Sequence, residues 1–273
     1  MSMIKAGVIG YPIRHSKSPI IHNYWFKKNN IQGSYEAIEI EPQNLEKDIQ
    51  TIIDQDFSGF NVTIPHKQLI IGLCDDIDET AKFIGAVNTV VIRNRELFGF
   101  NTDSYGFIQN IKQSQTNFIF KDKTAFVLGA GGAARAVIYG LLQEGVSEVI
   151  ITNRTREKAE ALVALNPSKI RVVDWQEREK SLNISDLVIN TTSLGMAGQP
   201  ALDLDLTSLN SSVLVTDIVY APLMTPLLKQ AQERGNSIVT GIGMLLHQAR
   251  PAFEKWTGVL PDVDDRLVQQ VLK

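Results

Sequence analysis

Residues 124–135, TAFVLGAGGAAR, form the segment that most restricts how this chain can fold. An apolar run ends there in a glycine-rich turn, and a helix of small residues follows. Gly129 permits the tight turn, Gly131 lets backbone approach a phosphate, and Ala134 allows the helix to pack closely on the strand. The helix N-terminus adds free N–H groups and a partial positive charge. The segment therefore predicts a strand, turn and helix that bind the pyrophosphate of a dinucleotide. The predicted contacts are Gly129, Ala130, Gly131, Gly132 and Ala133.

Short apolar strands alternate with amphipathic helices along nearly the whole chain, which predicts an α/β fold with mostly parallel sheets covered by helices. Before the glycine turn, we expect strands at 4–9, 34–40, 59–64 and 87–92, with helices at 19–28 and 45–54. From the turn onward, we expect strands at 124–128, 148–152, 170–173, 187–190, 213–218 and 237–240, with helices at 133–143, 156–165 and 225–233. Residues 114–123 are predicted to be a surface connection. Helices are expected around 244–256 and 266–272, with Pro251 kinking or splitting the first.

Composition narrows the class of protein. The chain has 273 residues, 44% of them hydrophobic, and a net charge of −3, which is typical of a soluble globular protein and argues against nucleic-acid or anionic-membrane binding. One cysteine excludes an internal disulfide and suits a reducing compartment. With only four histidines besides, no zinc-ligand cluster is expected. The start of the chain lacks the apolar run of a signal peptide. We therefore expect a cytoplasmic enzyme or binding protein without a metal.

The residues that follow the second strand of the cofactor region favour NADP over NAD. An NAD site normally has an acidic residue there to bind the ribose 2′-OH. This chain has Asn153, Arg154 and Thr155 instead, and Lys158 follows one turn later. A guanidinium suits a 2′-phosphate because it makes planar, charge-assisted hydrogen bonds. In the alternative interpretation, Thr155 only caps the next helix and Arg154 is a solvated surface charge.

Polar segments in the first half lie where ligands bind in open α/β sheets. Ser16 and Ser18 follow the first strand at a spacing that lets both hydroxyls point the same way, although Ser18 before Pro19 is also a good helix N-cap. Asn61 and Thr63 alternate with apolar residues, so one face of their strand is polar, and both are expected to bind the substrate. Pro65 ends this strand, and Lys67 follows just after it. A lysine there is alternatively a plain surface charge.

A further polar segment combines residues 86–89 with 99–103. Asn88 lies in an apolar strand and Asp103 just before a helix, so both are candidates for inward polar groups. Asp103 is alternatively an N-cap.

Nine segments, in order along almost the whole chain, resemble the shikimate dehydrogenase family. They are YPIRHSKSPIIHN, NVTIPHK, AVNTV, NTDSYGF, GAGGAAR, NRT, NTTSLGM, DIVYAPLMTPLL and GIGMLLHQA. The resemblance implies NADPH-dependent reduction of 3-dehydroshikimate to shikimate, on the route to chorismate and the aromatic amino acids. It also implies two α/β domains: residues 1–104 with 241–273 bind substrate, and residues 105–240 form a Rossmann-type NADP domain.

The resemblance further assigns roles to individual residues. It implies that Ser16, Ser18 and Tyr220 hold the substrate carboxylate and that Thr63, Asn88 and Gln248 bind the ring substituents. Lys67 and Asp103 become the catalytic pair. Such a lysine stabilises negative charge on the reacting oxygen and supplies its proton, while the aspartate orients the lysine. The remaining implied cofactor contacts are Thr192, Ile218, Gly241 and Met244, and for Met244 plain helix packing is the alternative.

The sequence departs from the family pattern at Tyr11, Phe100 and His66, none of which removes a catalytic residue. Two other functions stay open. One is a quinate or quinate/shikimate dehydrogenase of broader range on the same frame. The other is a regulatory protein that binds the nicotinamide cofactor without turnover, against which the retained Lys67 and Asp103 argue. A monomer and a homodimer are both compatible with the sequence.

Overall fold

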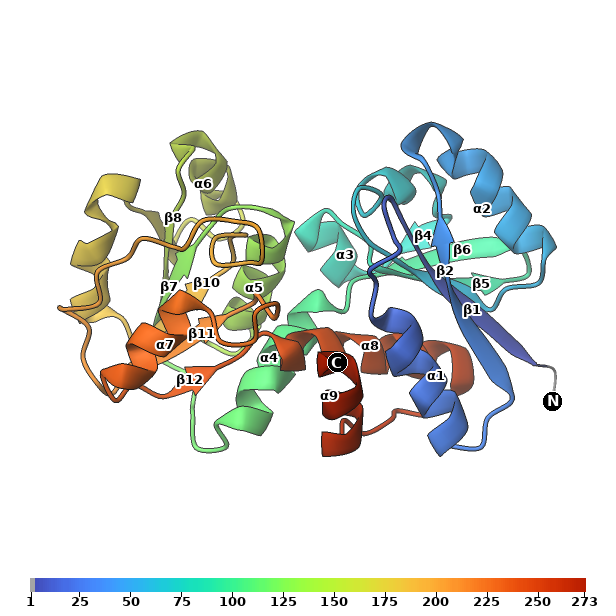
Figure 1. The fold of residues 1–273 in the computed structure, drawn as a ribbon. Helices are drawn as coiled ribbons and strands as arrows, with labels where there is room; N and C mark the ends of the chain where they lie inside the picture. The colour runs from blue at the N-terminus through green and yellow to red at the C-terminus, as the bar shows by residue number, and fades with distance from the viewer. Residues whose placement is uncertain (1–2) are drawn as a thin grey trace. The chain divides into compact units, whose positions relative to one another are not determined.

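The computed structural model describes residues 3–273, which divide into two compact units. The first unit contains the residues up to 102 together with 246–273, and the second contains residues 103–245. In Figure 1 the first unit runs from blue to cyan and ends in red, whereas the second runs from green to orange. Each unit has a sheet and helices of its own, as the alternation of strands and helices predicted.

The first unit has a mixed six-stranded sheet in the order β2-β1-β3-β5-β6-β4. β1 pairs in parallel with β2 and β3, whereas β5 runs antiparallel to both β3 and β6. β4 and β6, both absent from the prediction, extend the sheet. The strands are β1 (Ile4–Gly10), β2 (Gly33–Glu39), β3 (Gly59–Val62), β4 (Asp76–Ile77), β5 (Thr89–Arg93) and β6 (Glu96–Phe100).

Helices of the first unit bury one apolar face each. In α2 the buried side chains are Leu45, Ile49, Ile52 and Ile53, at the spacing of a single helix face. They pack with residues of the sheet, such as Phe60, in one core cluster. The helices are α1 (Ser18–Lys28), α2 (Leu45–Asp54), α3 (Glu79–Ile84) and α9 (Asp265–Leu272), with short 3₁₀ turns at Pro42–Asn44 and Leu69–Leu73.

The alternative that Ser18 is the N-cap of its helix is wrong. The residue at the N-cap of α1 is Lys17, whose carbonyl accepts from Ile20 N and Ile21 N, so Ser18 is already inside the helix. Asp103 is likewise the first residue within α4. At α1 the chain turns into the helical conformation at Lys17, one residue before the side chain that was expected to cap the helix. A capping role therefore does not explain the Ser18 side chain.

The second unit has an all-parallel six-stranded sheet in the order β12-β11-β10-β7-β8-β9. Its chain order reverses between β7 and β10, where ligands bind in doubly wound folds. The strands are β7 (Thr124–Leu128), β8 (Glu148–Thr152), β9 (Ile170–Val172), β10 (Leu187–Asn190), β11 (Leu214–Asp217) and β12 (Ile238–Val239). The helices are α4 (Asp103–Ser114), α5 (Gly132–Gln143), α6 (Arg156–Val163) and α7 (Pro226–Glu233), with a 3₁₀ segment at Trp175–Ile184.

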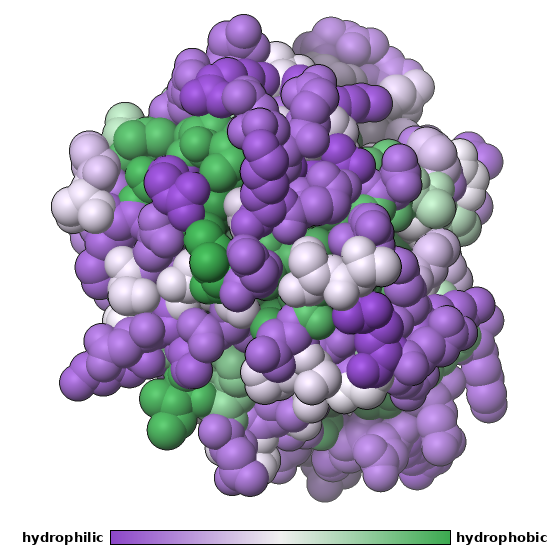
Figure 2. All heavy atoms as spheres, turned by 90° about the vertical axis from the view of Figure 1, so that its left-hand side faces the viewer, coloured by the Kyte–Doolittle hydropathy of each residue, from purple (hydrophilic) through white to green (hydrophobic). Residues whose placement is uncertain are grey.

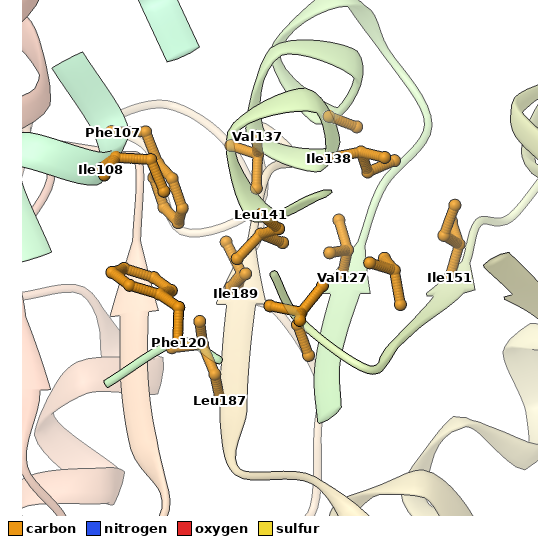
Figure 3. Close-up of a cluster of buried hydrophobic side chains, with 14 of the residues drawn as sticks. Phe107, Ile108, Phe120, Val127, Val137, Ile138, Leu141, Ile151, Leu187 and Ile189 are labelled. Atoms are coloured by element: carbon orange, nitrogen blue, oxygen red, sulfur yellow. The ribbon is translucent and has the colours of Figure 1, made fainter. Parts of the chain in front are cut away.

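One core of the second unit lies between its sheet and the helices α4 and α5. Phe107 of α4 and Leu141 of α5 face Val127 and Ile189 of the strands (Figure 3). Phe120 belongs to the same core and is 3% exposed, so the predicted surface connection at 114–123 is partly buried. Burial of its aromatic side chain anchors that connection to the unit. The face drawn in Figure 2 is mainly hydrophilic, with smaller apolar patches between the polar side chains.

Helix α8 (Ile242–Thr257) is continuous through Pro251, so the predicted split does not occur. Leu246, Ala249, Ala252 and Phe253 are fully buried on both sides of the proline. Burial of these side chains outweighs the roughly 3 kcal/mol that an interior proline costs a helix. The start of α8 packs closely against α4. A Cβ on Gly243 would come 1.9 Å from Asn110 Oδ1, so this contact requires glycine.

Candidate functional site

The glycine turn of the second unit leaves open space at a helix N-terminus. Gly129 has a φ of +110°, and a Cβ there would lie 2.6 Å from Thr191 Oγ1, so the turn requires glycine. Gly131 and Gly132 are different, because a Cβ on either would meet no atom within 4 Å in the described chain. No side chain caps α5, and its first turn has no acidic residue. This arrangement suits an anionic ligand, and it fits the pyrophosphate of a dinucleotide.

A cavity of about 170 Å³ lies beside this turn at the carboxyl edge of the second sheet, and Arg154 is part of its wall. Its lining brings together three of the predicted cofactor residues, Asn153, Arg154 and Thr192. Ser193 and Leu194, from the quoted segment NTTSLGM, also line it, and residues that the sequence did not single out complete it: Trp175, Gln199 and Pro200. Because no acidic side chain lines the cavity and Arg154 does, its chemistry fits a phosphate better than a free ribose hydroxyl.

Thr155 and Lys158 lie on the helix that starts beside this cavity. Thr155 is the N-cap residue of α6, but its side chain makes no capping hydrogen bond. Its carbonyl accepts instead from Asn153 Nδ2 at 2.8 Å. Lys158 is exposed in the first turn of α6. Thr155 therefore occupies the N-cap position without a capping hydrogen bond from its side chain. Thr155 and Lys158 both lie at the N-terminal end of α6, close in sequence to Arg154.

The loop after β10 is held by a buried hydrogen-bond network. Asn190 Oδ1 accepts from Thr192 Oγ1 at 2.7 Å, and Asn190 Nδ2 donates to Asp217 Oδ1 at 3.0 Å. Asp217 is 1% exposed and also accepts from Thr225 Oγ1 and Val219 N. Burial raises the pKa of this carboxyl, and the hydrogen bonds that it accepts oppose that rise. The network fixes the backbone that carries Thr192.

Ile218 and Gly241, two further predicted cofactor contacts, lie against each other. A Cβ on Gly241 would come 2.3 Å from the carbonyl oxygen of Ile218, so only glycine fits. Met244 N donates to Gly241 O, which begins α8 at this point. Met244 itself packs against the core of the second unit. The packing alternative for Met244 is thus real, and it does not exclude a contact with a cofactor.

The predicted substrate segments of the first unit converge on one edge of its sheet. β1 and β3 end at this edge, β6 also ends there, and the antiparallel β5 starts there. Backbone bonds link the segments: Tyr11 N donates to Ile64 O, and Val87 N donates to Lys67 O. Gly10 lets the first two segments approach, since a Cβ there would lie 2.6 Å from Thr63 Cγ2. Residues far apart in sequence therefore share one polar rim.

Asn88 is the centre of the polar side chains at this rim. It is 2% exposed, and its Nδ2 donates to Thr102 Oγ1 at 2.9 Å and to Gln248 Oε1 at 3.3 Å. Its Oδ1 accepts from Thr102 N at 2.9 Å. Gln248 comes from α8, near the other end of the chain, so the network ties α8 to the sheet edge. Asn61 lies deeper, 6% exposed, with its amide bonded inside the unit.

The remaining predicted substrate and catalytic residues fall in both units. Ser16 Oγ accepts from Ser18 N at 3.3 Å, so the two serines form one local turn before α1. Lys67 is half-buried in the first unit, and Asp103 begins α4 in the second. Tyr220 is 36% exposed in the second unit, where burial raises its pKa. The pairing of Lys67 with Asp103 and the carboxylate contacts stay predictions.

Two histidines near the rim are buried and make structural contacts. His66 has no exposed surface, and its Nε2 lies 2.7 Å from the carbonyl oxygen of Ile40, to which it must donate. His22 is also fully buried, stacked on Tyr35 with ring centroids 4.1 Å apart. Burial lowers the pKa of His22 to about 3. Cys74 is half-buried, and burial raises its pKa to about 11, which keeps the thiol protonated and unreactive.

Among residues 3–273, no group of His, Cys, Asp or Glu side chains is arranged to hold a metal ion. Within the same residues, every helix is too short or too polar to cross a membrane.

Comparison with known protein families gives three matches that succeed one another along the chain. Residues 8–90 match the shikimate dehydrogenase substrate binding domain. Residues 111–218 match the shikimate/quinate 5-dehydrogenase family, and residues 241–265 match the shikimate 5′-dehydrogenase C-terminal domain.

Individual relatives match over their full length. A shikimate dehydrogenase (NADP(+)) of Paramagnetospirillum magneticum is 48% identical over 98% of this chain and 97% of its own. A Thermus thermophilus shikimate 5-dehydrogenase, solved in complex with NADP(H) and shikimate, is 34% identical with a TM-score of 0.88 and covers 99% of this chain and 98% of its own. A Corynebacterium glutamicum quinate dehydrogenase in complex with NAD is 32% identical with a TM-score of 0.92, covering 99% of each chain.

Proposed function

The chain belongs to the shikimate dehydrogenase family, and from this premise we propose that it catalyses the reversible NADPH-dependent reduction of 3-dehydroshikimate to shikimate. It is an NADP(+)-dependent oxidoreductase of the route to the aromatic amino acids. The observation that carries the choice of cofactor is the cavity beside β8 and β10, which Arg154 lines without an acidic neighbour.

The second unit holds the cofactor in this proposal. Gly131 and Gly132 leave room for the pyrophosphate at the N-terminus of α5, and Arg154 with Asn153 receives the 2′-phosphate. The adjacent Lys158 adds positive charge. When bound, NADPH supplies the hydride. Thr192, Ile218, Gly241 and Met244 would line the path of its nicotinamide end, a role supported by the fixed backbone of the β10 loop.

The polar rim of the first unit binds the substrate in this proposal. Ser16 and Ser18, with Tyr220, hold the carboxylate, while Thr63, Asn88 and Gln248 bind ring hydroxyls. Support comes from the sheet edge that gathers the residues of the first unit and from the hydrogen bonds between Asn88 and Gln248. A site that hydrogen-bonds each hydroxyl rejects analogues without them, because its own polar groups would be left unpaired.

Lys67 is the proposed acid and base of the reaction. As hydride reaches the C3 carbonyl carbon, the carbonyl oxygen gains negative charge, which the Lys67 ammonium stabilises before it donates a proton. In this proposal Asp103 orients the Lys67 side chain toward the reacting oxygen. In the oxidative direction the same lysine accepts the proton of the C3 hydroxyl.

Initial rates with NADP+ or NAD+ against shikimate or quinate test the proposal. We expect the combination of NADP+ and shikimate to be the fastest by at least about tenfold, a difference of ~1.4 kcal/mol in transition-state binding. Comparable rates with quinate would identify a dehydrogenase of broader range, which the likeness to the quinate enzyme makes the alternative to exclude. Binding of NADPH without turnover of either acid would identify a regulatory protein instead.

A further inference from the structure

Asn61 lies directly beneath the polar rim and is bonded on both ends of its amide. Its Oδ1 accepts from Tyr35 Oη at 2.7 Å. Its Nδ2 donates to Thr89 Oγ1 at 3.0 Å and to the Asn88 carbonyl at 3.1 Å. Asn61 and Thr89 are direct partners across β3 and β5, so the contact is built into the strand register. Both donors of Asn61 are therefore used inside the protein.

The bonds continue from Thr89 to the rim with a consistent direction. Thr89 accepts from Asn61 and donates its own proton to Asn88 Oδ1 at 3.0 Å. Asn88 Oδ1 also accepts from Thr102 N, so its Nδ2 must face Thr102 Oγ1 and Gln248 Oε1. A flipped Asn88 amide would set donors against the Thr89 hydroxyl and the Thr102 N–H. Along this series, the hydrogen bond that each side chain accepts fixes the direction in which it donates to the next side chain.

Tyr35 begins this series of bonds and is itself held rigidly. It is 3% exposed on β2, and Asn23 clamps its backbone, donating to Tyr35 O at 2.8 Å and accepting from Tyr35 N at 3.0 Å. The His22 ring stacks on its face within 9° of parallel. The Tyr35 hydroxyl donates to Asn61 Oδ1, and the Ser18 side chain is its second hydrogen-bonding neighbour.

We propose that Tyr35 and Asn61 are positioning residues, which act through Thr89 to fix the orientation of the Asn88 and Gln248 amides toward the substrate. The proposal rests on the proposed function, in which Asn88 and Gln248 bind ring hydroxyls. It changes the role predicted for Asn61 from substrate contact to buried support. The fixed orientation contributes to substrate specificity. A correctly oriented amide presents an N–H donor to the substrate where a flipped amide would present an oxygen acceptor.

Tyr35→Phe deletes one hydroxyl and keeps the ring, and Tyr24→Phe is its matched control. Tyr24 also loses one hydroxyl hydrogen bond, to Asp264 at 2.7 Å, but on the outside of the same unit. We expect Tyr35→Phe to weaken shikimate binding, measured by calorimetry, roughly three- to tenfold, the worth of about one hydrogen bond. NADP+ binding and the circular dichroism spectrum should stay unchanged, and Tyr24→Phe should bind shikimate like the parent. Asn61→Asp, which replaces the donor end by an acceptor, should have the larger effect.

A double-mutant cycle with Asn88→Ala separates positioning from general stability, because the bonds from Thr89 reach Gln248 only through Asn88. If Tyr35 acts through the Asn88 amide, adding Tyr35→Phe to Asn88→Ala should weaken binding by less than about twofold, because coupled residues are not additive. Independent, additive losses in the double variant would overturn the proposal, as would parent-like binding by Tyr35→Phe. Parent-like binding by a folded Asn88→Ala protein would overturn both the proposed substrate contact and the positioning role that serves it.

Discussion

Replacing His22 by phenylalanine should remove a defined part of the pH dependence of stability. The His22 ring is fully buried between Tyr35, Trp25 and Trp256, and neither ring nitrogen has a hydrogen-bond partner among the described residues. Burial disfavours the imidazolium and lowers the pKa of His22 to about 3, although the nearby Asn61 amide offsets a small part of this effect. Phenylalanine keeps an aromatic ring in this position and cannot be protonated.

The magnitude follows from the protons bound by the two states. Between about pH 6.5 and pH 3 the unfolded chain protonates His22 and the folded chain does not, so stability falls as the pH is lowered. From pH ~7 to pH ~5.5 this one group should cost about 1.3 kcal/mol of unfolding free energy. The folded ring is neutral throughout that window, so the loss depends only on the unfolded pKa. His247, whose pKa burial lowers to about 4, adds a similar loss that is common to parent and variant and cancels between them.

Urea unfolding at the two pH values measures this difference. The chain has three tryptophans, and a Trp175→Phe background leaves Trp25 and Trp256, which both contact the His22 ring and belong to the first unit. Their fluorescence reports the unfolding of that unit. We expect the parent to lose about 1.3 kcal/mol more than His22→Phe on going from pH ~7 to pH ~5.5. Equal losses in the two proteins would refute a neutral, buried His22.

Other substitutions test the proposed chemistry. Lys67→Ala should lower kcat by roughly 10²- to 10⁴-fold with a modest change in the KM for shikimate; near-normal kcat would remove Lys67 from proton transfer. Arg154→Ala should raise the KM for NADPH roughly ten- to a hundredfold and that for NADH much less, since charged hydrogen bonds contribute about 1.5–3 kcal/mol; equal losses would mean that Arg154 does not bind the 2′-phosphate. His66→Ala should lower the unfolding free energy by about 1–3 kcal/mol, through the lost bond to Ile40, yet keep kcat per folded enzyme. Collapse of kcat in a folded His66→Ala protein would move the proton-transfer assignment toward His66.

The parts of the fold that depend on local rules were predictable from sequence. The glycine turn is confirmed in detail at Gly129, where a positive φ and the nearby Thr191 hydroxyl leave no room for a side chain. The α/β class, the family and the NADP preference are confirmed as well. The glycine turn and the NADP preference each rest on a short segment whose residues interact mainly with their own neighbours or with one ligand. The fold class and the family rest on many such segments in order along the chain.

The missed strand β6 shows where local rules stop. It pairs with β5 through a hairpin whose turn residues, Asn94 and Arg95, have φ of 52° and 69°. Such turns normally signal themselves by Asn-Gly or Asp-Gly. An arginine in the left-handed region gives no such signal, and pairing with β5 on one side and β4 on the other holds the strand in place.

The candidate site was predictable only where residue type and position coincide. Trp175 and Asp217 escaped prediction because they come from a 3₁₀ segment and a strand end that only tertiary packing brings to the cofactor region. No periodicity marks a side chain whose role depends on a neighbour from another segment. Asp217 did stand in a quoted family segment, DIVYAPLMTPLL, and a carboxylate at the end of an apolar strand was the signal available.

Asn61 and Asn88 show why sequence alone does not separate a ligand contact from its support. Both are asparagines among apolar strand residues, and both are almost completely buried. Antiparallel pairing with β5 sets Thr89 opposite Asn61, whereas Asn88 precedes that strand and meets Thr102 and Gln248 at the rim. A buried amide without partners would cost roughly 1–3 kcal/mol, so a polar group this deep persists only where its bonds are complete. The hydrogen bonds of the Asn61 amide are complete within the protein. We therefore expect its role to be the orientation of the Asn88 amide, which lies at the substrate rim.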